Sequence, residues 1–145
     1  MKNNLNNLNN FKKPIRTAIQ TNLAPAAIGP YSQAVSLEIN PINNLIFLSG
    51  QIALDPKTSE LVTGDFEARA RQIFKNMEAV CQAAGAKDLN SIIKLSIFLT
   101  DLSDFSRLNL IMKEFFTEPY PARSTIQVSG LPRGTDIEIE GILVV

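Results

Sequence analysis

Side chains able to do chemistry stand in two short segments late in the chain. Residues 119–125 read Pro-Tyr-Pro-Ala-Arg-Ser-Thr, and residues 137–141 read Ile-Glu-Ile-Glu-Gly. The two prolines fix backbone φ and remove N–H donors, so they form a stiff mount for Arg123. A guanidinium group is planar, permanently charged and forked, and it binds a carboxylate through two parallel hydrogen bonds. The alternative is a structural ion pair, which is what most arginines near carboxylates form.

A hydroxyl and two carboxylates follow Arg123 in the sequence. Thr125 is two residues further on, and Glu138 and Glu140 alternate with isoleucines. Such groups in one cleft could bind a small carboxylate-bearing substrate, position a water molecule and carry a proton, as hydrolysis of an imine requires. That reaction needs no metal ion. The alternative for Glu138 is an ion pair with Arg133, worth about 0–1 kcal/mol if exposed.

Two predicted strands have to position these groups. Residues 124–129 and 137–145 have strand-like patterns, and a loop with glycine and proline joins them. If the strands pair as a hairpin, Thr125 lies beside Glu138, with Arg123 at the mouth of the cleft. The sequence leaves the register of this pair open.

The strand predicted at 137–145 has two unlike faces, because side chains alternate with a period of two. One face is apolar and suits packing under helices: Ile137, Ile139, Gly141, Leu143 and Val145. The other face mixes charge with bulk: Glu138, Glu140, Ile142 and Val144. This mixture suits neither water nor a core. We therefore expect a partner subunit to cover the apolar part and a cleft to use the carboxylates.

The remaining pattern predicts a single α+β domain. Apolar residues at helical spacing predict two amphipathic helices, and β-branched runs beside turn residues predict strands. The expected elements are strands at 33–39 and 45–52 around a turn at 40–44, a helix from 65 to 85, a strand at 91–99 and a helix from 101 to 116. Cys81 lies in the apolar stripe of the first helix, so we expect a small buried hydrophobe rather than a site residue.

Composition argues against several classes of function. The chain has 145 residues, 45% of them hydrophobic, which suits one domain with one core. Lys plus Arg and Asp plus Glu each number 14, so no net field attracts phosphate, and nucleic-acid binding is not expected. With no histidine and one cysteine, the usual zinc and histidine-based catalytic sets are absent. No apolar run approaches the roughly 20 residues of a membrane span, and a cytoplasmic protein is expected.

Residues 1–20 differ in kind from the rest. Six asparagines fall in the first ten positions, and no acidic residue precedes Glu38. A stretch of this kind buries little surface, so we expect a flexible, basic extension ahead of a domain at 21–145. An organelle transit peptide is the alternative, although such peptides are usually rich in arginine and serine rather than asparagine.

Four motifs in order closely resemble the RidA (YjgF) family of reactive-intermediate deaminases. They are Ala-Pro-Ala-Ala-Ile-Gly-Pro-Tyr-Ser-Gln-Ala at 24–34, Leu-Ser-Gly-Gln-Ile at 48–52, Pro-Ala-Arg-Ser-Thr at 121–125 and Ile-Glu-Ile-Glu-Gly at 137–141. The resemblance covers residues 21–145. It implies a chorismate-mutase-like fold, with a single mixed β-sheet and two helices packed on one face. It also implies a homotrimer with active sites between subunits.

The resemblance implies an activity as well. Members of the family hydrolyse 2-imino acids, formed from enamines that PLP-dependent dehydratases release, to 2-keto acids and ammonia. A 2-iminobutanoate/2-iminopropanoate deaminase that uses no cofactor is therefore expected. Two rival functions remain: a module that binds a 2-keto acid or similar metabolite without turnover, and an RNA-directed endonuclease or translation inhibitor. Neutral net charge and the absence of histidine and tryptophan disfavour the RNA-directed function.

Roles for individual residues also follow from the resemblance. Arg123 would bind the substrate carboxylate, and Thr125 and Glu138 would position the attacking water, with Glu138 as general acid or base. Further substrate-binding positions are Tyr31, Ser49, Asn109 and Ser124. Taken singly, the first three could be a surface aromatic ring, a strand-end hydroxyl and a solvent-facing helix residue. The sequence departs from many active members in having Thr125 where they have cysteine, and its connection from 116 to 123 is shorter than in some.

Overall fold

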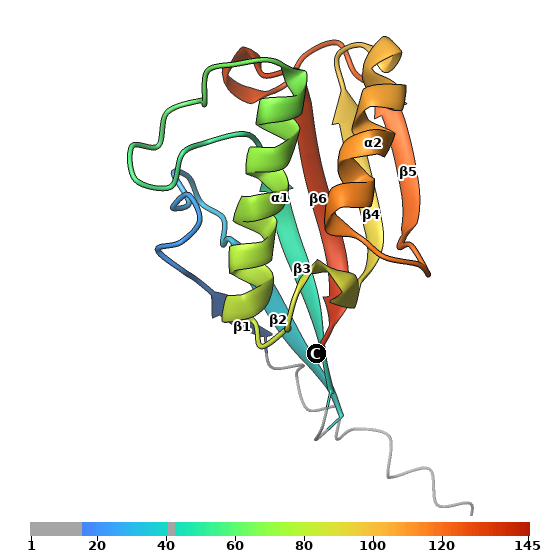
Figure 1. The fold of residues 1–145 in the computed structure, drawn as a ribbon. Helices are drawn as coiled ribbons and strands as arrows, with labels where there is room; N and C mark the ends of the chain where they lie inside the picture. The colour runs from blue at the N-terminus through green and yellow to red at the C-terminus, as the bar shows by residue number, and fades with distance from the viewer. Residues whose placement is uncertain (1–15, 41–42) are drawn as a thin grey trace, which may run out of the picture.

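A six-stranded sheet in the order β1-β2-β3-β6-β4-β5 carries two helices, α1 and α2, on one face (Figure 1). The structure is a computed structural model, and it describes residues 16–40 and 43–145. The strands are β1 (Arg16–Ile19), β2 (Ala34–Asn40), β3 (Asn43–Gln51), β4 (Ile92–Leu99), β5 (Ala122–Gln127) and β6 (Ile137–Val144). The helices are α1 (Phe66–Ala83) and α2 (Phe105–Phe115), with short 3-10 turns η1 (Leu89–Ser91), η2 (Leu102–Asp104) and η3 (Pro132–Gly134).

The core lies between the sheet and the two helices, as the sequence predicted. Helix α1 begins after Asp65, whose carboxylate accepts a hydrogen bond from the Ala68 N–H at 2.9 Å and caps the helix. Its apolar stripe is buried against the sheet, with Phe74 packed against the Phe115 ring of α2. Cys81 is fully buried, and this burial raises the pKa of its thiol to about 12. Its expected role as a small hydrophobe is confirmed.

The first three strands form an antiparallel meander. Strands β2 and β3 make the predicted hairpin, with Val35 opposite Phe47. Within the turn expected at 40–44, residues 41 and 42 lie outside the described residues. Strand β1 pairs with β2, so residues 16–19, within the extension predicted at 1–20, belong to the sheet. Residues 1–15 lie outside the described residues. No helix in the described ranges is long and apolar enough to cross a membrane.

The hairpin predicted between residues 124–129 and 137–145 is wrong. Strand β6 lies between β3 and β4 and is antiparallel to both, whereas β5 is parallel to β4 on the other side (Figure 1). The reason is α2, which carries the chain back after β4, so that β5 starts at the same end of the sheet as β4. Parallel neighbouring strands need a crossover of this kind. The loop through η3 then passes the end of β4 and lets β6 pair with the far edge of that strand.

The face of the sheet away from the helices is largely apolar. Its apolar members come from five strands and are identified by their cross-strand partners: Val35, Leu37, Leu45, Phe47, Phe98, Ile126, Ile142 and Val144. Glu138 and Glu140 of β6 lie on the same face. Phe47 is 41% exposed and Ile126 is 51% exposed. The predicted mixture of carboxylates and apolar residues on one face of β6 is thus confirmed, and we call this surface the open face.

Candidate functional site

Arg123 lies at the edge strand β5 and turns toward α2. Its Nη1 donates to Asn109 Oδ1 at 2.7 Å and to Met112 Sδ at 3.0 Å, and its guanidinium carbon stands 4.8 Å from the centre of the Phe105 ring. Burial lowers the pKa of the Arg123 guanidinium, which nevertheless keeps its charge at neutral pH. Asn109, which the resemblance placed among the substrate-binding residues, therefore lies beside Arg123.

The charge of Arg123 has no acidic partner among the described residues. Four other arginines each contact a carboxylate: Arg69, Arg71, Arg107 and Arg133. The structural ion pair considered for Arg123 is thus not formed within residues 16–40 and 43–145. The Arg123 cleft has a volume of about 420 Å³ and is lined by Asn109, Met112, Lys113, Tyr120, Pro121 and Arg123. A partly buried, unpaired cation beside such a cavity is suited to binding an anion.

Thr125 and Ser124 point to opposite faces of β5. Thr125 is opposite Ile97, which is fully buried under the helices, so its side chain shares the helix-covered face with Arg123. Thr125 Oγ1 is buried and has no hydrogen-bond partner among the described residues. Ser124 lies on the open face, where its hydroxyl accepts a hydrogen bond from Lys94 Nζ at 2.8 Å. One chain therefore does not bring Ser124 into the Arg123 cleft.

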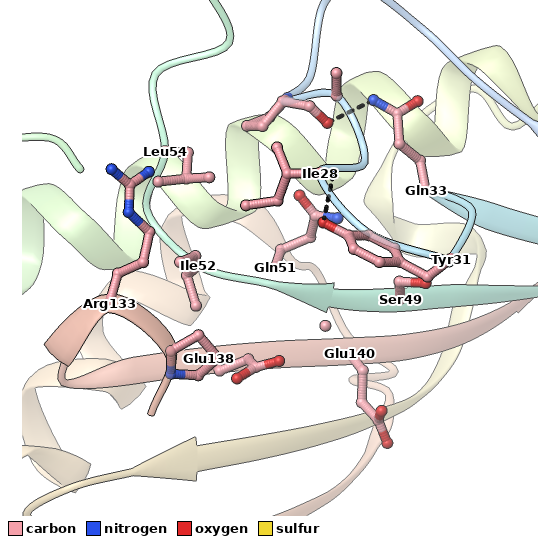
Figure 2. Close-up of a pocket in the computed structure, with 14 residues that line it drawn as sticks. Ile28, Tyr31, Gln33, Ser49, Gln51, Ile52, Leu54, Arg133, Glu138 and Glu140 are labelled. Carbon is pink, nitrogen blue, oxygen red and sulfur yellow. Dashed lines mark hydrogen bonds between the residues drawn. The ribbon is translucent and has the colours of Figure 1, made fainter. Parts of the chain in front are cut away.

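A second cavity, the Glu138 cleft, lies at the other end of the predicted set. It has a volume of about 480 Å³, and its lining includes Tyr31, Ser49 and Glu138. Figure 2 shows Ser49 on β3, the Tyr31 ring next to it, and the Glu138 carboxylate on the neighbouring strand β6. The Ser49 hydroxyl donates to the Ser32 carbonyl oxygen at 2.6 Å, and Tyr31 Oη accepts from the Ile28 N–H at 3.4 Å. The three residues that the motifs indicated do share one cavity.

Glu138 carries the perturbed carboxylate of this cleft. Burial raises the pKa of its carboxyl group, and the nearby negative charge of Glu140 raises it further. The ion pair with Arg133 that the sequence left open is not formed, because Arg133 Nη2 pairs with Glu60 at 2.8 Å. Figure 2 shows the Arg133 side chain directed away from the Glu138 carboxylate. Glu138 is therefore a proton acceptor with no cationic partner among the described residues.

The two clefts lie on opposite faces of the sheet. Residues directly opposite each other on neighbouring strands share a face. Glu138 is opposite Phe98, whereas Thr125 is opposite the preceding residue of β4, Ile97. The prediction that Thr125 and Glu138 meet across a hairpin is consequently wrong, because β4 separates them and their side chains point apart. Within one chain, Arg123 and Thr125 are not brought together with Glu138.

Sequence reasoning missed the residue that shapes the Glu138 cleft, Gln33. This side chain is 2% exposed, and its amide accepts from the Thr21 N–H and donates to the carbonyl oxygens of Thr21, Ala24 and Pro25. These bonds hold the segment that precedes Tyr31 over the cleft. Its place within the Gly-Pro-Tyr-Ser-Gln motif was the available signal, but the motif alone does not say that the glutamine points inward.

These features define an α+β protein of the RidA type: the order of the strands, the two helices on one face of the sheet, and the two clefts, each of which holds part of the predicted site. The chain matches the family described as Endoribonuclease L-PSP over residues 21–145. A solved structure of RidA from the Antarctic bacterium Psychrobacter sp. PAMC 21119 is similar, with a TM-score of 0.80 and 46% identity, covering 89% of this chain and 99% of that one. The chain belongs to this family, and the resemblance to RidA is confirmed.

Two further relatives carry informative names. A protein of Dermatophagoides farinae, named 2-iminobutanoate/2-iminopropanoate deaminase, is 47% identical over 127 residues, which is 88% of this chain and 94% of the relative. The Escherichia coli protein TdcF, solved with bound serine, is 40% identical with a TM-score of 0.78, covering 89% of this chain and 98% of that one. The family thus includes imine deaminases and at least one protein that holds a small amino acid.

Proposed function

We propose that this protein hydrolyses 2-imino acids to 2-keto acids and ammonia, in sites formed between the subunits of a homotrimer. The observation that carries the proposal is the division of the site. Arg123 and Thr125 lie on one face of the sheet and Glu138 on the other, and among the described residues Arg123 has no acidic partner and Glu138 no basic one. Two copies can supply the complementary halves. The deaminase name of the Dermatophagoides farinae relative supports the choice of substrate.

The open face supports assembly from several copies. Apolar residues such as Phe47 and Ile126 stand on it at 41% and 51% exposure, and apolar surface of this kind is typical of subunit interfaces. The edge strand β5 borders this face and carries Arg123 and Thr125 on its reverse. A second chain packed there brings its own Glu138 cleft toward the Arg123 cleft. A trimer, as the family resemblance implies, repeats this contact three times.

The chemistry needs a positioned substrate, a water molecule and a proton carrier. Arg123 binds the substrate carboxylate through its guanidinium fork, with Asn109 holding one arm of that fork at 2.7 Å. Thr125 Oγ1 and the Glu138 carboxylate hold the water. Glu138 removes one proton from the water as the water oxygen bonds to the carbon of the protonated imine, giving a neutral carbinolamine. The Glu138 carboxyl group then gives that proton to nitrogen and the C–N bond breaks. Ammonia leaves, and the hydroxyl proton passes to the Glu138 carboxylate as the C=O bond of the keto acid forms.

The remaining predicted residues complete the cavity. Tyr31 supplies an aromatic wall and a hydroxyl, and Ser49 supplies a second hydroxyl beside Glu138. Ser124 lies on the open face with Lys94, so we assign it to the contact between subunits that borders the site. The raised pKa of Glu138 suits a group that takes up a proton in one step and returns it in the next.

A coupled assay tests the proposed function. A PLP-dependent threonine dehydratase generates 2-iminobutanoate in place, because the imine also hydrolyses spontaneously, and formation of the keto acid is followed with and without this protein. We expect acceleration by the wild type and none by Arg123→Ala. Arg71→Ala is the matched control, since Arg71 pairs with Glu114 on the surface of the helices. Acceleration by Arg123→Ala equal to wild type contradicts the site.

A metabolite-binding module without turnover is the second candidate, and the serine held by TdcF favours it. The same assay separates the two functions. Absence of acceleration with several amino-acid precursors, together with binding of a 2-keto acid that Arg123→Ala abolishes, establishes the binding module. The family description names an endoribonuclease. RNA affinity that persists at moderate salt and after deletion of residues 1–20 would indicate a nucleic-acid function instead.

A further inference from the structure

Gly50 lies directly under the Glu138 carboxylate. A Cβ atom built on Gly50 would stand 2.0 Å from Glu138 Oε1, 3.0 Å from Cδ and 3.2 Å from Cγ. These separations are shorter than any ordinary van der Waals contact, so the carboxylate occupies the space where every other residue type carries a side chain. No other glycine in the described ranges has a built Cβ this close to a neighbouring atom.

The backbone does not explain the glycine. Positive φ among the described glycines occurs at Gly64, Gly85 and Gly134, and Gly50 is not one of them. An alanine at this position therefore meets no backbone strain of the left-handed kind. What it meets is the side chain of Glu138. The close approach at Gly50 thus involves a side chain of the neighbouring strand rather than a turn.

A β-bulge creates this contact. Leu48 of β3 is opposite Gly141 of β6, and Gln51 is opposite Ile139. Two residues of β3, at positions 49 and 50, therefore stand against one residue of β6, at position 140. A bulge of this kind bends the strand and re-aims the side chains beside it. Here it brings the Gly50 backbone close to the neighbouring side chain in the wall of the Glu138 cleft.

We propose that Gly50 is a positioning residue for imine hydrolysis, because its missing side chain provides the seat in which the Glu138 carboxylate is held toward the cleft. This inference rests on the proposed function. An alanine at position 50 moves the nearest carboxylate oxygen by at least about 1.4 Å, from 2.0 Å to the 3.4 Å at which ordinary contact begins. Displacements of about 1 Å at a reacting group can cost on the order of 100-fold in rate.

The carboxylate is the far end of a flexible side chain, so the fold can tolerate the change while the site cannot. We expect Gly50→Ala to lower kcat at least about tenfold with KM within about twofold of wild type, since substrate binding depends chiefly on Arg123. Gly130→Ala is the matched control, because a Cβ there meets nothing within 4 Å. Equal kcat values for the two alanine variants would overturn the proposal.

A double-variant comparison separates positioning through Glu138 from an independent role of Gly50. In the Glu138→Gln background, adding Gly50→Ala is expected to leave the residual rate unchanged, because the group that the glycine positions is already lost. A further loss of tenfold or more would show that Gly50 acts on its own and would contradict the proposal. If Gly50→Ala fails to fold, the double variant Gly50→Ala/Glu138→Ala is expected to fold, because it removes the clash with the carboxylate. Failure of both variants to fold would mean that the backbone, and not the Glu138 side chain, requires glycine at position 50, which would contradict the proposal.

An NMR titration of the Glu138 carboxyl group tests the seat without any turnover. The charged or titratable groups that line the same cleft are Tyr31, Arg133 and Glu140. Displacement toward solvent relieves the desolvation of Glu138, so its titration midpoint is expected to fall in Gly50→Ala and to stay unchanged in Gly130→Ala. An unchanged midpoint in both variants contradicts the seat. A wild type that lacks deaminase activity refutes the proposed function, while this titration still decides the position of Glu138.

Discussion

The side chains of Arg123 and Glu138 lie on opposite faces of one sheet, with strand β4 between their strands. Arg123 is opposite the fully buried Leu95, on the face that the helices cover, whereas Glu138 is opposite Phe98 on the open face. No side-chain rotation in a single chain brings the guanidinium and the carboxylate to one substrate. The reaction that we propose therefore depends on two chains for each site.

Mixing two inactive variants tests this dependence. Arg123→Ala and Glu138→Gln each remove one half of the site, and co-refolding them at equal amounts produces interfaces that combine the intact halves. With random assembly, about a quarter of the sites contain both intact groups, so we expect roughly a quarter of wild-type kcat per site. Keto-acid formation from in-place 2-iminobutanoate measures it. No recovery in verified mixed oligomers would mean that each site lies within one chain.

Local pattern predicted the elements well, because each depends on its own residues. The helical stripe from Phe66 to Cys81 and the two unlike faces of β6 were both confirmed. The buried side chains recur with the period of their helix or strand, and that period can be recognised from neighbouring positions in the sequence. The fold class and the two-helix layer followed in turn from the order of these elements and from the family motifs.

Strand order could not be predicted in the same way, because pairing is decided by distant segments. Treating β5 and β6 as a hairpin assumed that consecutive strands are neighbours, which is the common case but not a rule. The chain instead places β6 between β3 and β4, where Ile139 and Leu143 complete the core under α1. The contact between Gly50 and Glu138 could not be predicted for the same reason. The bulge that brings these two residues together leaves no pattern of residue types in the sequence.

The buried hydroxyl of Thr125 predicts that its removal lowers activity without lowering stability. Its Oγ1 has no partner among the described residues, and an unsatisfied buried hydroxyl costs about 1–3 kcal/mol. Thr125→Val keeps the shape and removes the hydroxyl. We expect the free energy of unfolding to stay equal or to rise by about 1 kcal/mol, measured by urea denaturation, while kcat falls about tenfold because the water loses one hydrogen bond.

Two other substitutions at Thr125 serve as controls. Thr125→Ser retains the hydroxyl, and Thr125→Cys introduces the residue that many active family members carry. Both should keep kcat within about threefold of wild type, because both retain a hydrogen-bonding group at the same place. If the valine variant is as active as these two, the hydroxyl does not hold the water, and Glu138 alone must position it.

The perturbed carboxyl group of Glu138 predicts the acid limb of the activity profile. Burial and the charge of Glu140 raise the pKa of Glu138, and water attack needs its ionised form. Activity is therefore expected to fall with decreasing pH at a midpoint above the ordinary value for glutamate of 4.5. Glu140→Gln removes the like charge and should move this midpoint to lower pH. The kcat profile of both proteins between pH 4 and pH 8 measures the shift, and coincident profiles would contradict it.

The same carboxyl group makes a prediction about stability. Its pKa is higher in the folded state than in the unfolded chain, so folding favours the protonated form and stability falls as the pH rises through these two values. Glu138→Gln removes this penalty. We expect the variant to have a higher Tm than wild type at pH 7, and the difference to shrink as the pH falls below about 4.5. A difference that grows on acidification would mean that Glu138 is stabilised as a carboxylate.

The buried amide of Gln33 predicts a change in substrate binding from outside the reacting groups. Its hydrogen bonds to Thr21, Ala24 and Pro25 hold the segment that leads to Tyr31. Gln33→Leu keeps the volume but leaves these backbone groups unsatisfied, which we expect to cost about 1–3 kcal/mol of unfolding free energy. Because the released segment lines the Glu138 cleft, KM should rise several-fold while kcat changes less.

Hydrogen exchange distinguishes this local release from general destabilisation. Amides of residues 21–31 should exchange faster in Gln33→Leu, whereas those of α1 should change only as the global stability changes. Gln72→Leu is the matched control, since among the described residues the Gln72 amide donates a hydrogen bond only to the Asn76 side chain on α1, at 2.9 Å. That variant should leave KM and the exchange of 21–31 unaltered. Uniform acceleration of exchange in Gln33→Leu, with KM unchanged, would make Gln33 a core residue with no influence on the cleft.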